Sequence, residues 1–284
     1  MKLKIGASSG GGEHSYKKLA EYGYQCADFQ MANTGAYWYT CTHNEFEKVL
    51  KQEKAWADAY GIEIHQMHGP WGEPDNQLEF DLTPKSLKSM LDDRKKSIEA
   101  CTYLGCKNWV IHPIFPYGRE DEKVGKVEES LKINFEFYSE LVETAREYDV
   151  TICFENMPFG FCSLNSVSKI KNFIDKMNNN HFKACLDTGH VMAIGDVTSG
   201  EAARIFGKDL RVLHVHDSRP GYDLHMMPYF GCIDWEDFYN GLCDIGFNGV
   251  FNLECAPPNK IAHDLRVEFA KLQIGLAKQI LHDN

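Results

Sequence analysis

The chain has 284 residues, of which 43% are hydrophobic and 25% are charged, a composition typical of a globular protein with a large buried core. The formal net charge of −11 repels phosphate backbones and disfavours nonspecific binding of nucleic acid. We find no apolar stretch long enough for a signal peptide or a membrane span. None of the ten cysteines belongs to a Cys-x-x-Cys pair, so we expect reduced, buried thiols in a cytoplasmic protein.

Short apolar runs alternate with longer amphipathic segments along the chain. We expect β-strands at Lys2–Ala7, Cys26–Gln30, Ile62–His68, Trp109–His112, Thr151–Glu155, Lys183–Asp187, Leu210–His216 and Gly249–Glu254. Apolar residues at helical spacing predict α-helices at Glu45–Tyr60, Pro84–Leu104, Glu128–Tyr148, Ser166–Asn178, Glu201–Phe206, Trp235–Ile245 and His263–Leu281.

Eight strands, each followed by a helix, predict an all-parallel sheet. Closed into a (β/α)₈ barrel, such a sheet uses about the available length, so we expect a single TIM-barrel domain over residues 1–284. The alternative is an open, doubly wound sheet, which favours a Gly-x-Gly-x-x-Gly phosphate turn after the first strand. The segment Ser8–Gly12 does not match that motif, and we interpret it as a flexible loop.

Polar side chains end six successive predicted strands. Barrel enzymes place their active groups at the C-terminal ends of the strands. In chain order these ends carry His68, His112, Glu155, Asp187, His214 and Glu254. Such oxygen and nitrogen donors bind divalent metals, and a metal offsets the cost of burying carboxylates together. Each residue alone is more typical of a satisfied polar group or a helix cap, but six on one face favour a metal site.

These residues resemble the xylose-isomerase-like barrels, a family of sugar isomerases and epimerases together with endonuclease IV enzymes. The resemblance covers essentially the whole chain. Its motifs are Phe-Glu-Asn at Glu155, Leu-Asp-Thr-Gly-His at Asp187, His-Val-His-Asp at His214 and Asn-Leu-Glu at Glu254. It implies that these four residues bind one divalent ion, Mn²⁺, Mg²⁺, Co²⁺ or Zn²⁺. His214 is preferred to His216 because the family pattern has an acid three residues after the ligand, here Asp217.

The sugar epimerases of this family use two glutamates both as metal ligands and as acid and base on opposite faces of the substrate. The resemblance implies these catalytic roles for Glu155 and Glu254. It also assigns substrate contacts to His68, His112, His190 and Arg219, although the spacing of Arg219 departs from the family pattern.

The endonuclease branch of the family holds three zinc ions. Its additional ligands match His68, His112, His190, Asp223 and His225. This chain departs from that branch at Tyr229–Gly231, where the endonucleases have Gly-Glu-Gly. The segments Gln30–Asn33, Tyr37–Tyr39 and His68–Trp71 instead combine aromatic and polar groups, as sugar pockets do.

The favoured function is therefore a metal-dependent isomerase or epimerase of a sugar or sugar phosphate. It would transfer a proton next to a carbonyl through an enediolate, with a hydride shift still open. One alternative is a zinc phosphodiesterase acting on abasic DNA, with more than one zinc ion. Another is a non-catalytic sugar- or metal-binding barrel. We expect a small sugar as partner, neither nucleic acid nor membrane, and leave a homo-oligomer open.

Overall fold

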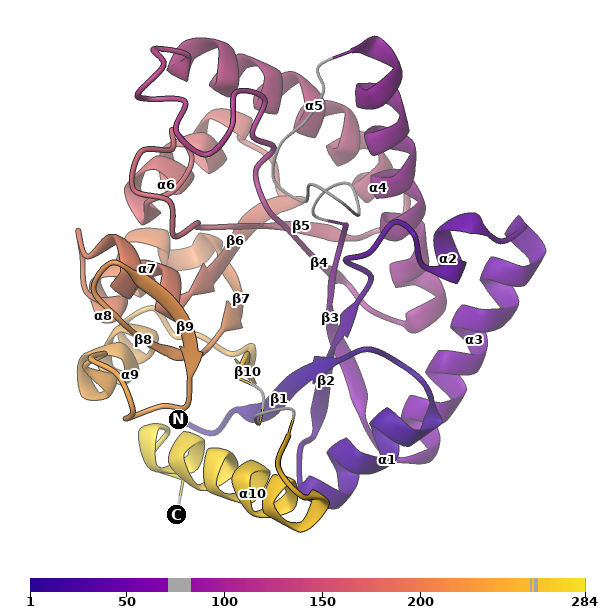
Figure 1. The fold of residues 1–284 in the computed structure, drawn as a ribbon, viewed down its shortest axis with the longest axis vertical. Helices are drawn as coiled ribbons and strands as arrows, with labels where there is room; N and C mark the ends of the chain where they lie inside the picture. The colour runs from indigo at the N-terminus through magenta and orange to yellow at the C-terminus, as the bar shows by residue number, and fades with distance from the viewer. Residues whose placement is uncertain (71–82, 256, 258–259, 284) are drawn as a thin grey trace.

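The structure is a computed structural model that describes residues 1–70, 83–255, 257 and 260–283. Parallel strands alternate with helices around a central barrel (Figure 1). The barrel strands are β1 (Lys4–Ser9), β2 (Cys26–Gln30), β3 (Glu63–His68), β4 (Asn108–Ile111), β5 (Thr151–Glu155), β6 (Phe182–Asp187), β7 (Leu210–His214) and β10 (Val250–Leu253). The helices are α1 (Glu13–Tyr22), α2 (Tyr37–Thr40), α3 (His43–Ala59), α4 (Pro84–Leu104), α5 (Val127–Glu147), α6 (Val167–Met177), α7 (Thr188–Ile194), α8 (Ser199–Phe206), α9 (Trp235–Asp244) and α10 (His263–Ile280), with a 3₁₀ turn at Gly207–Asp209.

The sheet closes on itself. Its strand order is β10-β1-β2-β3-β4-β5-β6-β7. The two outer strands then meet beyond the end of β7, where the Val215 amide donates to the Asn252 carbonyl (2.8 Å) and the Glu254 amide donates to the Val215 carbonyl (2.9 Å). The predicted TIM barrel is confirmed, and the open-sheet alternative is wrong.

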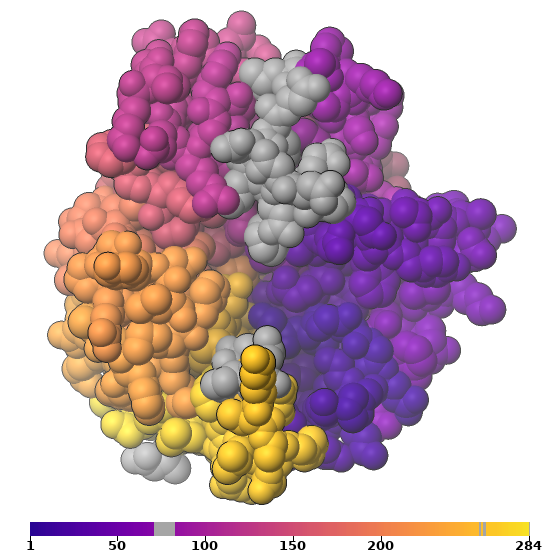
Figure 2. All heavy atoms as spheres, viewed as in Figure 1, coloured from indigo at the N-terminus to yellow at the C-terminus, as the bar shows by residue number. Residues whose placement is uncertain are grey.

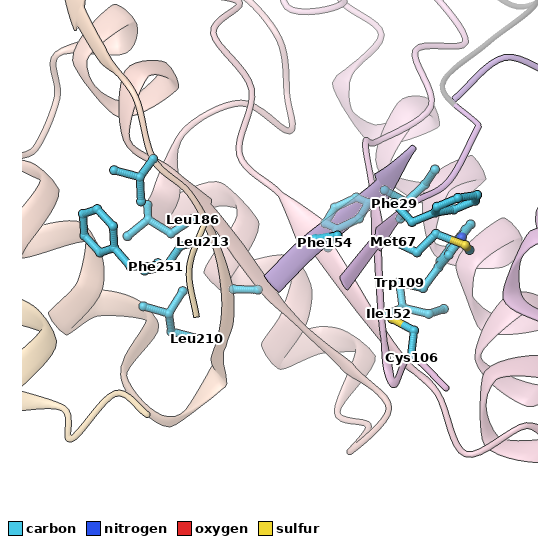
Figure 3. Packing of buried hydrophobic residues seen from close by; sticks show 14 of the residues in the cluster. Phe29, Met67, Cys106, Trp109, Ile152, Phe154, Leu186, Leu210, Leu213 and Phe251 are labelled. Atoms are coloured by element: carbon cyan, nitrogen blue, oxygen red, sulfur yellow. The ribbon is translucent and has the colours of Figure 1, made fainter. Parts of the chain in front are cut away.

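Alternate residues of each barrel strand face the helices and form most of the hydrophobic core. Phe154 of β5, for example, packs against Tyr138 of α5 and Phe173 of α6, with ring centroids 4.9 and 5.2 Å away. Figure 3 shows this core on two sides of the barrel, around Trp109 and Phe154 on one side and around Leu213 and Phe251 on the other.

The intervening residues face the barrel axis. Four of them form a separate, fully buried apolar layer: Val110, Cys153, Cys185 and Val212. Because side-chain direction along a strand repeats every two residues, the residues two positions later face the same axis at the C-terminal end. These are His112, Glu155, Asp187 and His214.

Most other expectations from the sequence hold for the described residues. All ten cysteines are free. Seven of them are buried, as expected, but Cys41 is half-buried and Cys232 and Cys243 are exposed. Thr83 caps α4 by accepting a hydrogen bond from the Ser86 amide, with Pro84 in the first turn and Gly105 at the C-cap. Within the described residues, no helix combines the length and the apolar character that a membrane crossing requires.

The structure differs from the sequence prediction after the first and the seventh barrel strands. Ser8 and Ser9 belong to β1 and pair with Asp28 and Phe29, so the predicted loop Ser8–Gly12 begins only after Ser9. The helix α1, which was not predicted, follows directly. The predicted strand Leu210–His216 ends at His214, because Val215 turns to β10 and the chain then forms a hairpin of β8 (Asp217–Arg219) and β9 (Tyr222–Met226).

The hairpin stands over the mouth of the barrel. In the space-filling view of Figure 2, it forms the orange side of a hollow whose opposite side is the N-terminal third of the chain. This is the face on which the C-terminal ends of the strands open.

Candidate metal and active site

The strand register brings the predicted donors to one rim. β2 and β3 pair Gln30 with His68, and β6 and β7 pair Asp187 with His214. Because all eight strands are parallel, side chains that end neighbouring strands and face the axis lie at the same height. The polar strand ends seen in the sequence therefore converge at the mouth.

Glu155, Asp187, His214 and Glu254 form what we call the central cluster. One donor atom from each lies within 4.8 Å of those of the others. His214 Nδ1 lies 3.0 Å from Oε1 of Glu155 and 3.0 Å from Oε2 of Glu254. The Glu254 side chain is 24% exposed, whereas the other three are buried. The four residues implied by the family resemblance are thus brought together, with His214 rather than His216 among them.

Asp28 of β2 lies on the other side of the His214 ring. It is fully buried, and its Oδ2 is 3.1 Å from His214 Nε2. Gln66 of β3 donates to the same oxygen at 3.3 Å. A carboxylate that accepts the Nε2 proton leaves Nδ1 directed at the cluster, the usual arrangement behind a metal-binding histidine. The sequence analysis missed Asp28; its one signal was an acid between Ala27 and Phe29 in a predicted strand.

His68 and His112 lie beside the central cluster. Their Nε2 atoms are 3.3 Å apart and lie 3.6 and 3.3 Å, respectively, from Oε2 of Glu155. Glu155 therefore bridges two groups, since its Oε1 faces His214. Its Oε2 is buried, yet accepts no hydrogen bond from the described residues.

A third group, which we call the hairpin cluster, consists of His190, His216, Asp223 and His225. Asp223 lies 3.3 Å from His190 Nε2 and 3.4 Å from His225 Nε2 through its two oxygens. His216 Nε2 lies 3.0 Å from Asp187 Oδ2, which joins this group to the central cluster. From the sequence, His214 was preferred to His216 as a metal ligand, and the membership of His216 in the hairpin cluster was not predicted.

Asp217 fixes the hairpin that carries Asp223 and His225. Its buried carboxylate accepts hydrogen bonds from the backbone amides of Ser218, Cys232 and Ile233 and from the Trp235 indole, at 2.9 to 3.2 Å. The acid three residues after His214 is thus an anchor for the loop rather than a member of the central cluster.

Burial and pairing together set the charges of the site. Burial opposes ionisation of Glu155, but His214 and His112 outweigh it and hold the pKa of Glu155 well below its usual value. Burial raises the pKa of Glu254, against the opposing effect of His214. Burial also lowers the pKa of His112 to about 4. The two glutamates therefore differ: Glu155 is held as an anion, and Glu254 takes up a proton more easily.

The central cluster fits a divalent cation. His214 Nδ1 lies 3.0 Å from each of two carboxylate oxygens. The single proton that this nitrogen can carry cannot form a good hydrogen bond with both oxygens. A cation among these atoms satisfies all of them, and three carboxylates with one imidazole suit Zn²⁺, Mn²⁺, Co²⁺ or Mg²⁺. Glu155 Oε2 accepts no hydrogen bond from the described residues and faces the Nε2 atoms of His68 and His112. These three atoms together provide donors for a second ion.

A polar cavity of about 260 Å³ opens above these groups. Its described lining residues are Glu155, Glu254, Asp223, His68, His112, His190, His225, Gln30, Arg119, Met157, Pro158 and Phe159. Arg119 packs over the Phe159 ring at 4.6 Å, whereas Arg219 is exposed on β8 and is not among these lining residues.

Of the segments predicted to form a sugar pocket, two contribute a residue to the polar cavity. Gln30 and His68 line it. Tyr37–Tyr39 lie within α2, where Trp38 packs against Phe29 and the Tyr39 hydroxyl donates to the Met31 carbonyl. They do not appear among the described lining residues. Trp71 lies outside the described residues.

Replacement of Asp28 tests the support behind His214. Asp28→Asn keeps the shape but removes the charge, so we expect zinc affinity to fall by about 10- to 100-fold. The measurement is a zinc titration of metal-stripped protein against a chromophoric chelator. Asp58→Asn, an exposed acid on α3, is the control and should bind zinc as the wild type does. Wild-type affinity in folded Asp28→Asn protein would contradict this role.

The chain matches a known protein family over most of its length. The family described as "Xylose isomerase-like TIM barrel" matches residues 16–271. Inosose isomerase of Bacillus subtilis (strain 168) is 26% identical over 196 residues, which cover 66% of this chain and 68% of that protein. D-psicose 3-epimerase of Ruminiclostridium cellulolyticum is 27% identical over 208 residues, which cover 72% and 67%.

Solved structures share the fold over nearly the whole chain. A D-tagatose 3-epimerase-like protein superposes with a TM-score of 0.78 at 23% identity, over 99% of both chains. The IolI protein, solved with a bound zinc atom, superposes with a TM-score of 0.73 at 19% identity, over 98% of both chains. With a family match that spans most of its length, this chain belongs to the xylose isomerase-like TIM barrel family.

Proposed function

We propose that this protein is a metal-dependent isomerase or epimerase of a small sugar, acting by proton transfer next to a carbonyl. The observation that carries the proposal is the pair of carboxylates, Glu155 and Glu254, which flank His214 Nδ1 and line one polar cavity. Taking a proton from one position and returning one to another requires two such groups. The isomerases and epimerases among the relatives support the same class.

The two glutamates divide the work according to their charges. Glu155, the anion, takes the proton from the carbon next to the carbonyl, and the electron pair of that bond moves towards the carbonyl oxygen. Glu254, the more easily protonated group, returns a proton to the opposite face of the same carbon, which gives an epimer. Alternatively it protonates the former carbonyl carbon, while the hydroxyl proton on the neighbouring carbon passes to the former carbonyl oxygen, which gives an isomer. A divalent ion, when bound in the central cluster, stabilises the negative charge that develops on the substrate oxygens.

The remaining lining residues hold the sugar. His68, His112 and His190 present ring nitrogens to the cavity for hydroxyl groups, and Phe159 offers an apolar face for the sugar ring. The position of Arg119 at the cavity favours it over Arg219 as the arginine that contacts substrate. Its charge would also suit a sugar phosphate.

Metal removal tests the first part of the proposal. We expect a chelator to abolish deuterium uptake from heavy water into a ketose such as D-psicose, and Mn²⁺, Mg²⁺, Co²⁺ or Zn²⁺ to restore it. The reason is that the charge developed beside the carbonyl lacks compensation without the ion. Mass spectrometry of the recovered sugar measures the uptake. Undiminished exchange in protein shown to be metal-free would refute the metal dependence.

Replacement of the glutamates tests the second part. Glu155→Gln and Glu254→Gln should each lower kcat by about 10²- to 10⁴-fold, because each removes a proton-transferring group. Bound metal is measured in both variants, since both residues are also proposed ligands. Glu63→Gln, at the opposite end of β3 and exposed, should keep the wild-type kcat. A metal-loaded Glu155→Gln or Glu254→Gln enzyme with normal turnover would exclude that residue as acid or base.

A zinc phosphodiesterase acting on abasic DNA is the second candidate. The observation that favours it is the adjacency of three donor groups: the His68–His112–Glu155 group, the central cluster and the hairpin cluster. The family resemblance links these positions to a three-zinc site. The net charge of −11 opposes it, because binding several phosphates requires clustered cations.

One pair of assays separates the two activities. We expect deuterium uptake or isomerisation with ketoses and aldoses and no cleavage of an abasic-site duplex at physiological salt. Product formation without deuterium uptake would indicate a hydride shift in place of proton transfer. Metal-dependent nicking of the duplex with no turnover across the sugar panel would reverse the ranking. Bound metal and bound sugar with neither activity would identify a non-catalytic binding barrel.

A further inference from the structure

A second cavity lies outside the central cluster, between helices α1 and α10 and the ends of β1 and β10. Its volume is about 370 Å³, and we call it the side cavity. Helices α1 and α10 lie side by side at this edge of the barrel (Figure 1). The cavity is lined largely by the apolar side chains Leu19, Tyr22, Tyr24, Leu253, Pro257 and Ala270. A cavity of about 150 Å³ lined by apolar groups already holds benzene, so a ring-sized group fits here.

The buried polar groups of the side cavity are occupied by one another. The Tyr24 hydroxyl donates to Gln273 Oε1 at 2.8 Å, and Gln273 Nε2 donates to the Cys255 carbonyl at 2.6 Å. The Cys255 thiol is buried and lies 2.8 Å from the same Gln273 nitrogen. Three further polar residues line the cavity apart from the wall described next. Ser8 is exposed, and Ser15 and Lys18 are half-buried. The interior therefore favours an apolar ligand group over a polar one.

The side cavity shares a wall with the polar cavity. Glu254 and His225 line both, and His225 Nδ1 lies 2.9 Å from the Glu254 carbonyl. Glu254 is the proposed acid, so a sugar placed for reaction has its reacting carbons next to this wall. A substituent attached close to those carbons can extend past Glu254 into the side cavity.

We propose that the side cavity binds an apolar, ring-sized substituent of the substrate, and that the protein therefore prefers keto sugars carrying an aryl group, such as aryl glycosides whose sugar ring keeps a carbonyl. The proposal rests on the proposed function for the reacting end of the substrate. An unsubstituted sugar occupies the polar cavity alone and buries no apolar surface beside α1 and α10. Burial of a phenyl ring there is expected to tighten binding by about 10- to 30-fold.

The test compares two probes that differ only in the substituent. Phenyl β-D-glucoside and methyl β-D-glucoside have no free carbonyl and therefore report binding without turnover. Their dissociation constants are measured by calorimetry on metal-loaded protein, and the phenyl compound should bind about tenfold more tightly or better. Ala270→Met fills the side cavity from α10 and should bring the ratio close to one. Lys271→Met adds the same side chain at the next, exposed position of α10 and should keep the wild-type ratio.

Tyr22→Ala provides a second test in case the Ala270→Met protein does not fold. Tyr22→Ala removes an aromatic wall of the side cavity from half-buried Tyr22 and should lower the phenyl preference without filling the space. Unfolding temperature and bound metal are measured for every variant. Equal binding of the two glucosides by the wild type, no detectable binding of either, or an unchanged ratio in folded Ala270→Met overturns the proposal.

Deuterium uptake into unsubstituted ketoses separates this proposal from the proposed function. Uptake without a phenyl preference leaves the isomerase or epimerase standing and removes the side cavity as a substrate site. A phenyl preference that Ala270→Met abolishes, with no exchange on any sugar, retains the binding site and refutes the proton-transfer activity.

Discussion

Each ionised carboxylate buried without compensation costs several kcal/mol, and the mouth of this barrel gathers Glu155, Asp187 and Glu254 around one point. The protein supplies part of the compensation through His214 Nδ1, which faces Glu155 and Glu254 at 3.0 Å each. In the proposed function, a divalent cation at this point completes it. The same requirement explains why His214 is held from behind by Asp28, a second buried acid that fixes which ring nitrogen faces the cluster.

The site is built in layers along the barrel axis. Small apolar side chains such as Cys153 and Cys185 fill the interior below, and the inward residues two positions later are Glu155 and Asp187. This arrangement excludes water from beneath the donors and keeps their electrostatic interactions strong. The hairpin anchored by Asp217 then covers the donors from above. In the proposed function, the reaction takes place between the apolar layer of the barrel interior and the hairpin that hydrogen bonds hold in place.

In the proposed function, Glu254 links proton transfer in the polar cavity to binding of the substituent in the side cavity. It belongs to the central cluster, lines the polar cavity and also forms a wall of the side cavity. A substituent bound between α1 and α10 would therefore be held next to a group that moves the proton. Binding energy gained from the substituent can position the reacting carbons, which is how contacts remote from the reacting atoms contribute to rate.

The sequence by itself determined the barrel and the identity of the central cluster. Alternating strands and helices admit few topologies, and the strand-end pattern placed six polar residues at one rim, from which the family resemblance selected Glu155, Asp187, His214 and Glu254. Only the tertiary structure decided the rest. Asp28 sits inside a strand, and its role depends on a contact with a residue 186 positions away, which no local pattern encodes. His216 and Arg119 gained their places because the chain leaves the barrel after His214 and because the loop after β4 folds over the mouth. The side cavity exists only where α1 and α10, from opposite ends of the chain, pack next to each other when the barrel closes.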